Sequence, residues 1–196
     1  MENKIILENE IFYCQHIDAD EELHELIHQF TVQTETGQGL VDYLQYHALR
    51  DEFANEMRTY LVRDKQSHEL VGYFSLKAGM VSFNERKGIV KSEFDCVPGI
   101  ELANFAVNNS YKEKHDYEGL GSIIFSYFIL PIAKNASKQI GVKMLYIFAL
   151  PYANLIHYYE TLRFGRLSPA EEYYVHNRIK PRYDADCIFM CQALNE

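Results

Sequence analysis

The stretch that decides the fold runs from Ile100 to Ile124 and begins Ile100-Glu101-Leu102-Ala103-Asn104-Phe105-Ala106-Val107. This opening has the apolar and aromatic content of a mostly buried strand, with two polar residues set into it. Turn formers follow at Asn108-Asn109-Ser110. Two closely spaced glycines then occur in Glu118-Gly119-Leu120-Gly121-Ser122, ahead of the apolar run Ile123-Ile124-Phe125. The segment therefore predicts a strand, a polar turn and a helix.

The glycine turn is a candidate anion site. Glycine lets the backbone turn tightly and lie close against a ligand. The first turn of the helix that follows leaves its N–H groups without partners inside the helix, and together with the helix dipole these donors favour an anion such as a pyrophosphate. A Gly-x-Gly pair alone is weak evidence, because many such turns are only structural.

The sequence beyond the turn continues the pattern. A second apolar strand is predicted over Gly141–Leu150, and a helix that carries Tyr158-Tyr159-Glu160 is predicted from Asn154 to Gly165. The order of strand, glycine turn, long helix, strand and tyrosine-bearing helix resembles the GNAT superfamily of acyl-CoA-dependent N-acetyltransferases. The resemblance covers Leu40 to Phe164, and Ala185–Gln192 looks like the last strand of the family.

Within that superfamily, the chain looks most like the branch that includes tRNA-acetylating toxins. Three segments carry this likeness, namely Leu40–Leu49, Val71–Leu76 and Ile140–Lys143. The resemblance implies an α/β (α+β) fold, with a mixed, mostly antiparallel central sheet flanked by helices. We expect residues 1–196 to form a single domain of this kind.

The resemblance also implies a site for acetyl-CoA, which acts as a cosubstrate. The cofactor is expected between the strands that end near Val107 and Leu150, with its pyrophosphate on the glycine turn. The expected cofactor-binding residues are Phe105, Ala106, Val107, Glu118, Gly119, Leu120, Gly121, Ser122 and Asn154. The strand residues would act through backbone N–H and C=O groups that pair with the pantetheine amides as an added strand would. Asn154 could equally cap its own helix.

Two catalytic residues follow from the resemblance. Glu101 would be the general base that frees a primary amine, because an ammonium with a pKa near ~10 has no lone pair to attack a thioester. The alternative is that the strand begins one residue later and leaves Glu101 at a solvated end. Tyr159 would protonate the departing CoA thiolate. Core packing is its alternative role, and Tyr158 is the next candidate if the register is off by one.

The implied reaction is direct transfer of an acetyl group to a primary amine of a small molecule or a protein. A formal charge of −9 favours a cationic or neutral substrate, because a nucleic-acid surface is normally basic. Nucleic acid is therefore an unlikely partner on charge alone. Two alternatives stay open: a toxin-type enzyme that acts on aminoacyl-tRNA, and a non-catalytic acyl-CoA sensor. The sensor is favoured by Asp116, which stands where the family has a phosphate-friendly side chain, and by a lengthened turn.

A zinc-protease signature, H-E-x-x-H, also occurs at His24–His28. We interpret it as the solvent side of a helix whose apolar residues Leu23, Leu26, Ile27 and Phe30 face the core. Scattered cysteines, with Cys187 and Cys191 on one face of a strand, indicate small core residues rather than a zinc site. No metal is expected.

Several expectations concern the rest of the chain. The apolar run Ile123–Ala133 is too short to span a bilayer, and the N-terminus lacks the pattern of a signal peptide, which predicts a cytoplasmic protein without membrane contact. A homodimer is left open. Leu40–Met57 is predicted to be helical, Ala78–Gly99 a surface excursion, and Ser168–Asp184 an irregular cover.

Overall fold

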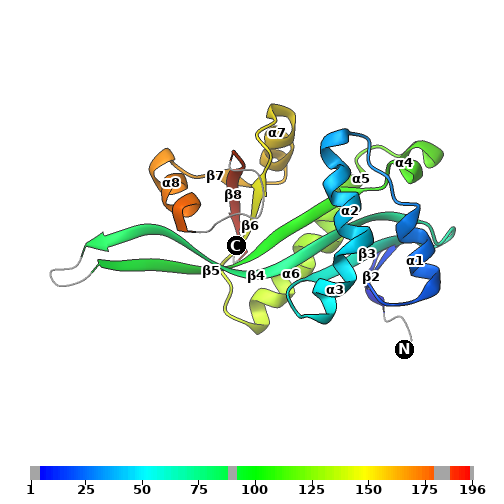
Figure 1. Ribbon diagram of the computed structural model, residues 1–196, viewed down its shortest axis with the longest axis horizontal. Coiled ribbons are helices and arrows are strands. Elements are labelled where there is room, and N and C mark those ends of the chain that lie inside the picture. Colours follow the sequence, from blue (N-terminus) through cyan, green and yellow to red (C-terminus); the bar gives the residue numbers. More distant parts are fainter. Residues whose placement is uncertain (1–4, 88–91, 179–185, 195–196) are drawn as a thin grey trace. The chain divides into compact units, whose positions relative to one another are not determined.

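The computed structural model describes residues 5–87, 92–178 and 186–194, with the side chains of 83–87, 92–95 and 178 left out. The chain divides into two compact units. Unit 1 holds Met1–Lys77 and Leu102–Ile132, and unit 2 holds Ala78–Glu101 and Ala133–Glu196. Figure 1 labels the elements of both units along the chain.

The strands follow one another by hydrogen bonding in the order β1-β2-β3-β4-β5-β6-β8-β7. Among the described pairs, β5 and β6 run parallel, whereas β1–β2, β2–β3, β3–β4, β6–β8 and β7–β8 are antiparallel. The sheet is therefore mixed and mostly antiparallel, as the sequence predicts. The strands are β1 (Ile5–Glu8), β2 (Phe12–His16), β3 (Arg58–Asp64), β4 (Leu70–Lys87), β5 (Ser92–Val107), β6 (Met144–Ala149), β7 (Gly165–Arg166) and β8 (Ile188–Ala193).

In chain order, the described helices lie between these strands. They are α1 (Glu21–His28), η1 (Glu35–Gly37), α2 (Gln38–Tyr46), α3 (Ala48–Phe53), α4 (Asn109–His115), α5 (Leu120–Ile124), the π-helical turn η2 (Phe125–Ile129), α6 (Leu130–Gln139), α7 (Ala153–Thr161) and α8 (Pro169–Arg178).

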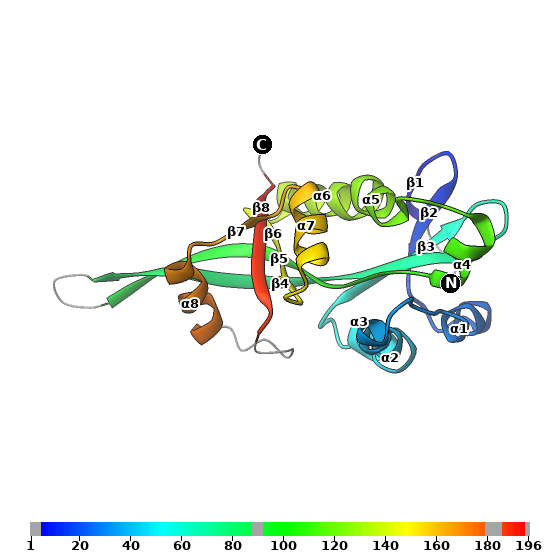
Figure 2. The ribbon, with the colours of Figure 1, turned by 90° about the horizontal axis from the view of Figure 1, so that it is seen from above.

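In unit 1, helices cover both faces of the sheet. The helices α1, α2 and α3 pack against one face, where Leu23 and Leu44 meet Leu61 and Tyr73 in one buried cluster. Figure 2 shows these helices on the opposite side of β3 and β4 from α5. Burial of aliphatic and aromatic side chains between these layers is the main term that stabilises the unit.

The helix that follows the glycine turn is continuous from Leu120 to Gln139. Its π-helical turn lies directly before Pro131, which has no N–H to donate to the preceding turn and whose ring would collide with it. The irregular turn of this helix is therefore explained by the proline. By length and composition this helix could cross a membrane, which for a single helix is weak evidence because core helices of soluble proteins pass the same test. Ile124 and Phe128 of this helix are buried in the structure.

In unit 2, β6 is the central strand. Its residues Met144 and Tyr146 lie in a buried cluster with Val81 of β4, Val175 of α8 and Phe189 of β8. The helix α8 covers this cluster.

The surface excursion expected over Ala78–Gly99 is wrong. Strand β4 continues to Lys87 and β5 begins at Ser92, so both strands of the hairpin are long. The charged residues misled the prediction, because an antiparallel pair can bury one face and leave the other in water. Val81 and Val97 supply the packed face here.

Two helical expectations also needed correction. The helix expected over Leu40–Met57 is two helices, α2 and α3, separated at His47, whose backbone angles are −123° and −34°. The irregular cover expected over Ser168–Asp184 contains α8. Ser168 and Glu171 form a capping box at its start, with the Glu171 carboxylate accepting from the Ser168 N–H at 3.1 Å. Residues 179–184 lie outside the described part of the chain.

Candidate active site

The end of β5 presents two faces. Leu102, Asn104 and Ala106 are buried, whereas Phe105 and Val107 are half-buried. A strand alternates its side chains between two faces. Phe105 and Val107 therefore share one face, and the three buried residues share the other. The strand was expected to be mostly buried, and it is so on one face.

Asn108 ends β5 and begins α4. Its amide Nδ2 donates to the Leu70 carbonyl at 2.7 Å, and its Oδ1 accepts from the Ser110 N–H at 3.3 Å as an N-cap. The helix α4, which lengthens the polar turn, was not predicted from the sequence. The asparagine N-cap at Asn108 was the signal that could have found it.

The lengthened turn has a simple backbone cause. Asp116 ends α4 in the left-handed conformation, with φ 48° and ψ 42°, which aspartate tolerates better than most side chains. Gly119 is also left-handed, with φ 68° and ψ 14°, and it precedes α5. Among the described residues, no side chain caps this helix start, so the first N–H groups of the helix have no side-chain acceptor there.

A hollow of about 420 Å³ adjoins the turn. It is lined by Gln33, Asn109, Lys112, Glu113, Asp116, Tyr117, Glu118 and Gly119. The exposed Glu118 belongs to this lining. One lysine among three carboxylates makes the rim acidic, which opposes an anion in the hollow itself.

Gly72 holds the glycine-turn helix close to the end of β5. A Cβ at this position would lie 2.7 Å from the Ala106 carbonyl oxygen and 2.7 Å from Ile124 Cδ1. The absence of a side chain at Gly72 therefore permits α5 to approach the strands. This close approach brings Ala106 of β5 near Ile124 of α5 within unit 1.

Glu101 belongs to unit 2, where it pairs with Tyr146 of β6 in the parallel register. The Tyr146 hydroxyl donates to Glu101 Oε2 at 3.5 Å. Burial, and then the Glu101 carboxylate, raise the pKa of Tyr146. Glu101 is half-buried inside β5, so the strand does not begin one residue later. Sequence reasoning missed Tyr146, because its place depends on register between strands.

Tyr159 lies on α7 of the same unit. Its ring makes an edge contact with the buried Phe164, with centroids 5.6 Å apart, and lies beside Tyr158 at 5.4 Å. Burial, and then the Tyr158 phenol, raise the pKa of Tyr159, so the hydroxyl stays protonated at neutral pH. Asn154 is exposed near the helix start, and its Oδ1 accepts from the Leu155 N–H at 3.0 Å.

The expected site residues thus fall into two groups. Unit 1 holds the strand end and the turn, with Phe105, Ala106, Val107, Glu118, Gly119, Leu120, Gly121 and Ser122. Unit 2 holds Glu101, Asn154 and Tyr159.

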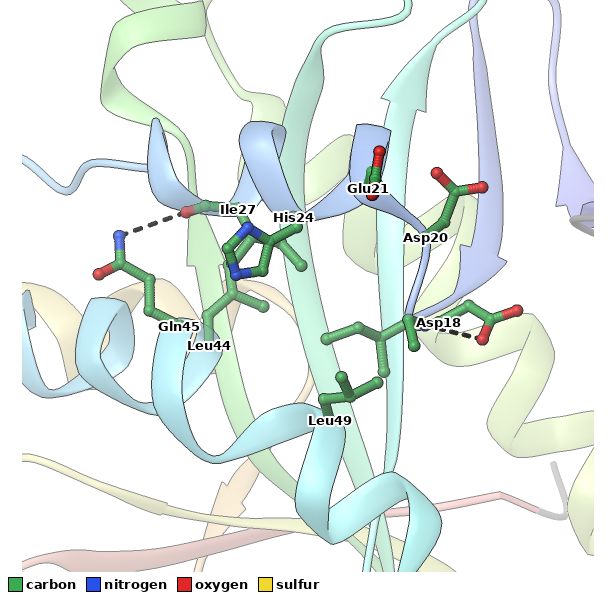
Figure 3. Close-up of a pocket in the computed structure, with 10 residues that line it drawn as sticks. Asp18, Asp20, Glu21, His24, Ile27, Leu44, Gln45 and Leu49 are labelled. Carbon is green, nitrogen blue, oxygen red and sulfur yellow. Dashed lines mark hydrogen bonds between the residues drawn. The ribbon is translucent and has the colours of Figure 1, made fainter.

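The H-E-x-x-H motif lies on the exposed side of α1, as interpreted from the sequence. His24 and His28 are exposed, with their Nε2 atoms 3.2 Å apart, while Leu23 and Ile27 are buried. Figure 3 shows His24 over a cavity of about 230 Å³ whose lining includes Ile27 and Leu44. Within the described residues, no group of three potential ligands could hold a metal ion.

The strand order, the parallel β5–β6 pair and the helix that follows the glycine turn define the GNAT-type acetyltransferase fold. No protein-family model matches the sequence. Solved structures do match it over most of its length. One is a tyrosine-to-phenylalanine mutant of the toxin AtaT bound to acetyl-CoA and to the C-terminus of the antitoxin AtaR, with a TM-score of 0.63 and 16% identity over 93% of each chain.

Two further solved structures agree. A mutant of KacT matches with a TM-score of 0.67 and 16% identity, over 94% of this chain and 96% of that one. AtaT complexed with acetyl-methionyl-tRNAfMet matches with a TM-score of 0.64 and 16% identity, over 91% of this chain and 93% of that one. The fold expected from the sequence is confirmed.

Proposed function

We propose that the protein is an acetyl-CoA-dependent N-acetyltransferase. The observation that carries the proposal is the match in fold over most of the chain to toxins that were solved with acetyl-CoA. The glycine turn supports it independently, because a left-handed Gly119 precedes a long helix whose start has no side-chain cap among the described residues. Such a start suits the pyrophosphate of the cofactor.

The proposed chemistry is direct transfer. Glu101 takes a proton from the acceptor ammonium, and the free amine nitrogen attacks the thioester carbonyl carbon. Backbone N–H groups of Phe105–Val107 polarise that carbonyl, and Asn154 contacts the cofactor arm. The carbon–sulfur bond then breaks, and the thiolate receives the phenol proton of Tyr159. The new amide nitrogen loses its extra proton, which returns to the Tyr159 phenolate through solvent, and Glu101 releases the proton it took to solvent. The raised pKa of Tyr159 keeps this proton on the phenol at neutral pH.

For the acceptor, we propose the α-amino group of an aminoacyl-tRNA. The support is the similarity to AtaT, which was solved with acetyl-methionyl-tRNAfMet. The chemistry agrees, because an α-amino group has a pKa of about 8 and is partly neutral at physiological pH, so a single carboxylate suffices as base. The tRNA was disfavoured by charge alone, and the comparisons favour it over the acceptor expected first.

A small-molecule or protein amine is the second candidate. The charge of −9 supports it, since an acidic protein attracts cationic amines and repels phosphate. We further propose a cytoplasmic location, where both acetyl-CoA and charged tRNA occur. The single domain over residues 1–196 and a homodimer stay predictions.

The test is acetyl transfer from radiolabelled acetyl-CoA to a panel of aminoacyl-tRNAs, polyamines and peptides. We expect turnover with aminoacyl-tRNA, and a loss of about 100-fold or more in Glu101→Gln and Tyr159→Phe. Tyr158→Phe is the matched control, because it removes a neighbouring phenol from the same helix. Turnover that survives both site variants would contradict the mechanism. Acetyl-CoA binding without transfer to any acceptor would favour the non-catalytic sensor.

A further inference from the structure

Two glycines in unit 2 mark a slot on the face of the sheet. Along β5, Val97, Gly99 and Glu101 alternate onto one face, and along β4, Gly79 and Val81 do the same. The valines pack into the buried cluster of this unit, so the glycines are the two positions of this face where the side chain is missing.

Tyr146 fills this slot. A Cβ on Gly99 would lie 2.9 Å from Cδ1 of the Tyr146 ring, and a Cβ on Gly79 would overlap the Tyr146 hydroxyl. The ring therefore extends from β6 across β5 and ends over β4. The side chain is 2% exposed, and it stacks on Phe189 with centroids 5.5 Å apart. A phenol held on both sides in this way has little freedom to turn away.

The hydroxyl of this fixed ring ends beside Glu101. It donates to Oε2 at 3.5 Å, which is a long contact of the kind that tightens when a substrate closes the site. We propose that Tyr146 is a positioning residue for Glu101: it donates a hydrogen bond to the carboxylate, orients it, and stabilises its ionised form. The inference rests on the proposed function, in which Glu101 is the base.

The physical consequence is a defined protonation state for each partner. A hydrogen bond to a carboxylate favours the charged form and so extends base function to lower pH. The pKa of Tyr146 is raised by burial and by the Glu101 charge, so the phenol stays a donor throughout the working range.

Other ionisable groups lie at the buried cluster that contains Tyr146. An experiment on Glu101 must distinguish them from this carboxylate. From β8, the Cys191 thiol packs against the cluster, with a pKa raised by burial and by Glu171. From α8, His176 contacts Phe148 at 6.1 Å between ring centroids and lies 3.8 Å from Glu172. Because a pH–rate profile combines every group that titrates, it alone would not identify Glu101.

The test therefore follows the Glu101 carboxyl directly. Carbon NMR of the full chain with labelled glutamate, with the Glu101 signal assigned by its loss in Glu101→Gln, gives the pKa of this group in the wild type and in Tyr146→Phe. We expect the pKa to rise by about one unit in Tyr146→Phe, since the phenylalanine keeps the ring and loses only the donor. The acid limb of kcat/KM for acetyl transfer should move upward by the same amount.

Two further variants sharpen this test. Gly79→Ala pushes the hydroxyl aside and should raise the Glu101 pKa in the same direction, which covers the case that Tyr146→Phe does not fold. Tyr60→Phe, which removes another buried phenol in β3 of unit 1, should leave it unchanged. In a Glu101→Gln background, Tyr146→Phe should have no further effect on the rate.

The outcomes separate the two claims. An unchanged Glu101 pKa in both Tyr146→Phe and Gly79→Ala would overturn the positioning role, whether or not the wild type transfers acetyl groups. A raised pKa in a protein that acetylates no acceptor would support the pairing and refute the proposed function.

Discussion

The carboxylate of Glu69, which lies in the turn between β3 and β4, joins this turn to α4 within unit 1. Its Oε1 accepts from Lys114 Nζ at 2.7 Å, and its Oε2 lies 2.8 Å from His115 Nε2, so that β3 and β4 are tied to α4. The pKa of Glu69 is lowered to about 2, chiefly by the hydrogen bond from Lys114 and against the opposing effect of burial.

This shift predicts a pH-dependent contribution to stability. A carboxylate with a lowered folded-state pKa stabilises the fold above its unfolded pKa and loses this contribution as the pH falls. Glu69→Gln should therefore lower the free energy of unfolding at neutral pH by about 1 kcal/mol or less, because the pair is partly exposed. Urea titrations should show the difference from wild type shrinking between about pH 5 and pH 2. A difference that stays constant with pH would contradict the assignment.

The proposed role of Tyr159 predicts how kcat depends on pH and on this phenol. Since burial raises its pKa above the ordinary value, its phenol should produce no alkaline loss of activity below about pH 10. Tyr159→Phe should lower kcat about 100-fold at every pH in this range, with an unchanged melting temperature. Rates should be read beside those of Tyr158→Phe. If Tyr158→Phe is the slower variant, the register of the helix assignment is off by one.

Among the elements, the close contact between α5 and the sheet depends on Gly72. Gly72 leaves no room for a methyl group between the Ala106 carbonyl and Ile124. Gly72→Ala should therefore lower the free energy of unfolding by about 1 to 3 kcal/mol through overpacking. It should also weaken binding of acetyl-CoA, because the glycine turn moves with α5.

Gly141→Ala is the matched control for Gly72→Ala. Nothing lies within 4 Å of a Cβ at Gly141, and its backbone is not left-handed. Thermal unfolding should place its melting temperature within about 2 °C of wild type, whereas Gly72→Ala should fall by about 5 °C. Equal losses in both variants would show that the close approach at Gly72 is unimportant.

The elements recoverable from sequence were those with a local signal. The strand over Ile100–Val107, which is the end of β5, the glycine turn at Gly119 and the tyrosine-bearing helix all follow from turn chemistry or periodicity. The long hairpin of β4 and β5 was lost because its polar residues resemble those of a loop. The helix α8 was missed although Ser168 and Glu171 spell a capping box.

The site was recoverable to a smaller extent. Glu101 was predicted as the base through a family resemblance, and that role stays a prediction, whereas its hydrogen-bond partner Tyr146 lies 45 positions further along the chain. The slot at Gly79 and Gly99 exists only once three strands are in register, and no local pattern encodes that register. Sequence reasoning therefore finds single catalytic candidates more readily than the residues that orient them.

At the scale of the whole molecule, charge opposes the proposed acceptor. A protein of net charge −9 that binds tRNA must do so through a local basic surface. Its affinity should fall with added salt, because the counterions that binding releases from the tRNA then gain less entropy. We expect KM for aminoacyl-tRNA to rise several-fold between about 50 and 200 mM salt, whereas KM for acetyl-CoA changes less. Filter binding and kinetics at stepped salt concentrations measure both. A KM for aminoacyl-tRNA that falls with added salt would mean that the acidic protein repels the tRNA. That result would favour a cationic amine as the acceptor.

The most direct test of the central claim is single-turnover transfer from radiolabelled acetyl-CoA to aminoacyl-tRNA by the wild-type protein. We expect a label on the α-amino nitrogen that is lost in Glu101→Gln and in Tyr159→Phe but retained in Tyr158→Phe. Acetyl-CoA that binds without transferring its label, to tRNA or to any other amine offered, would contradict it.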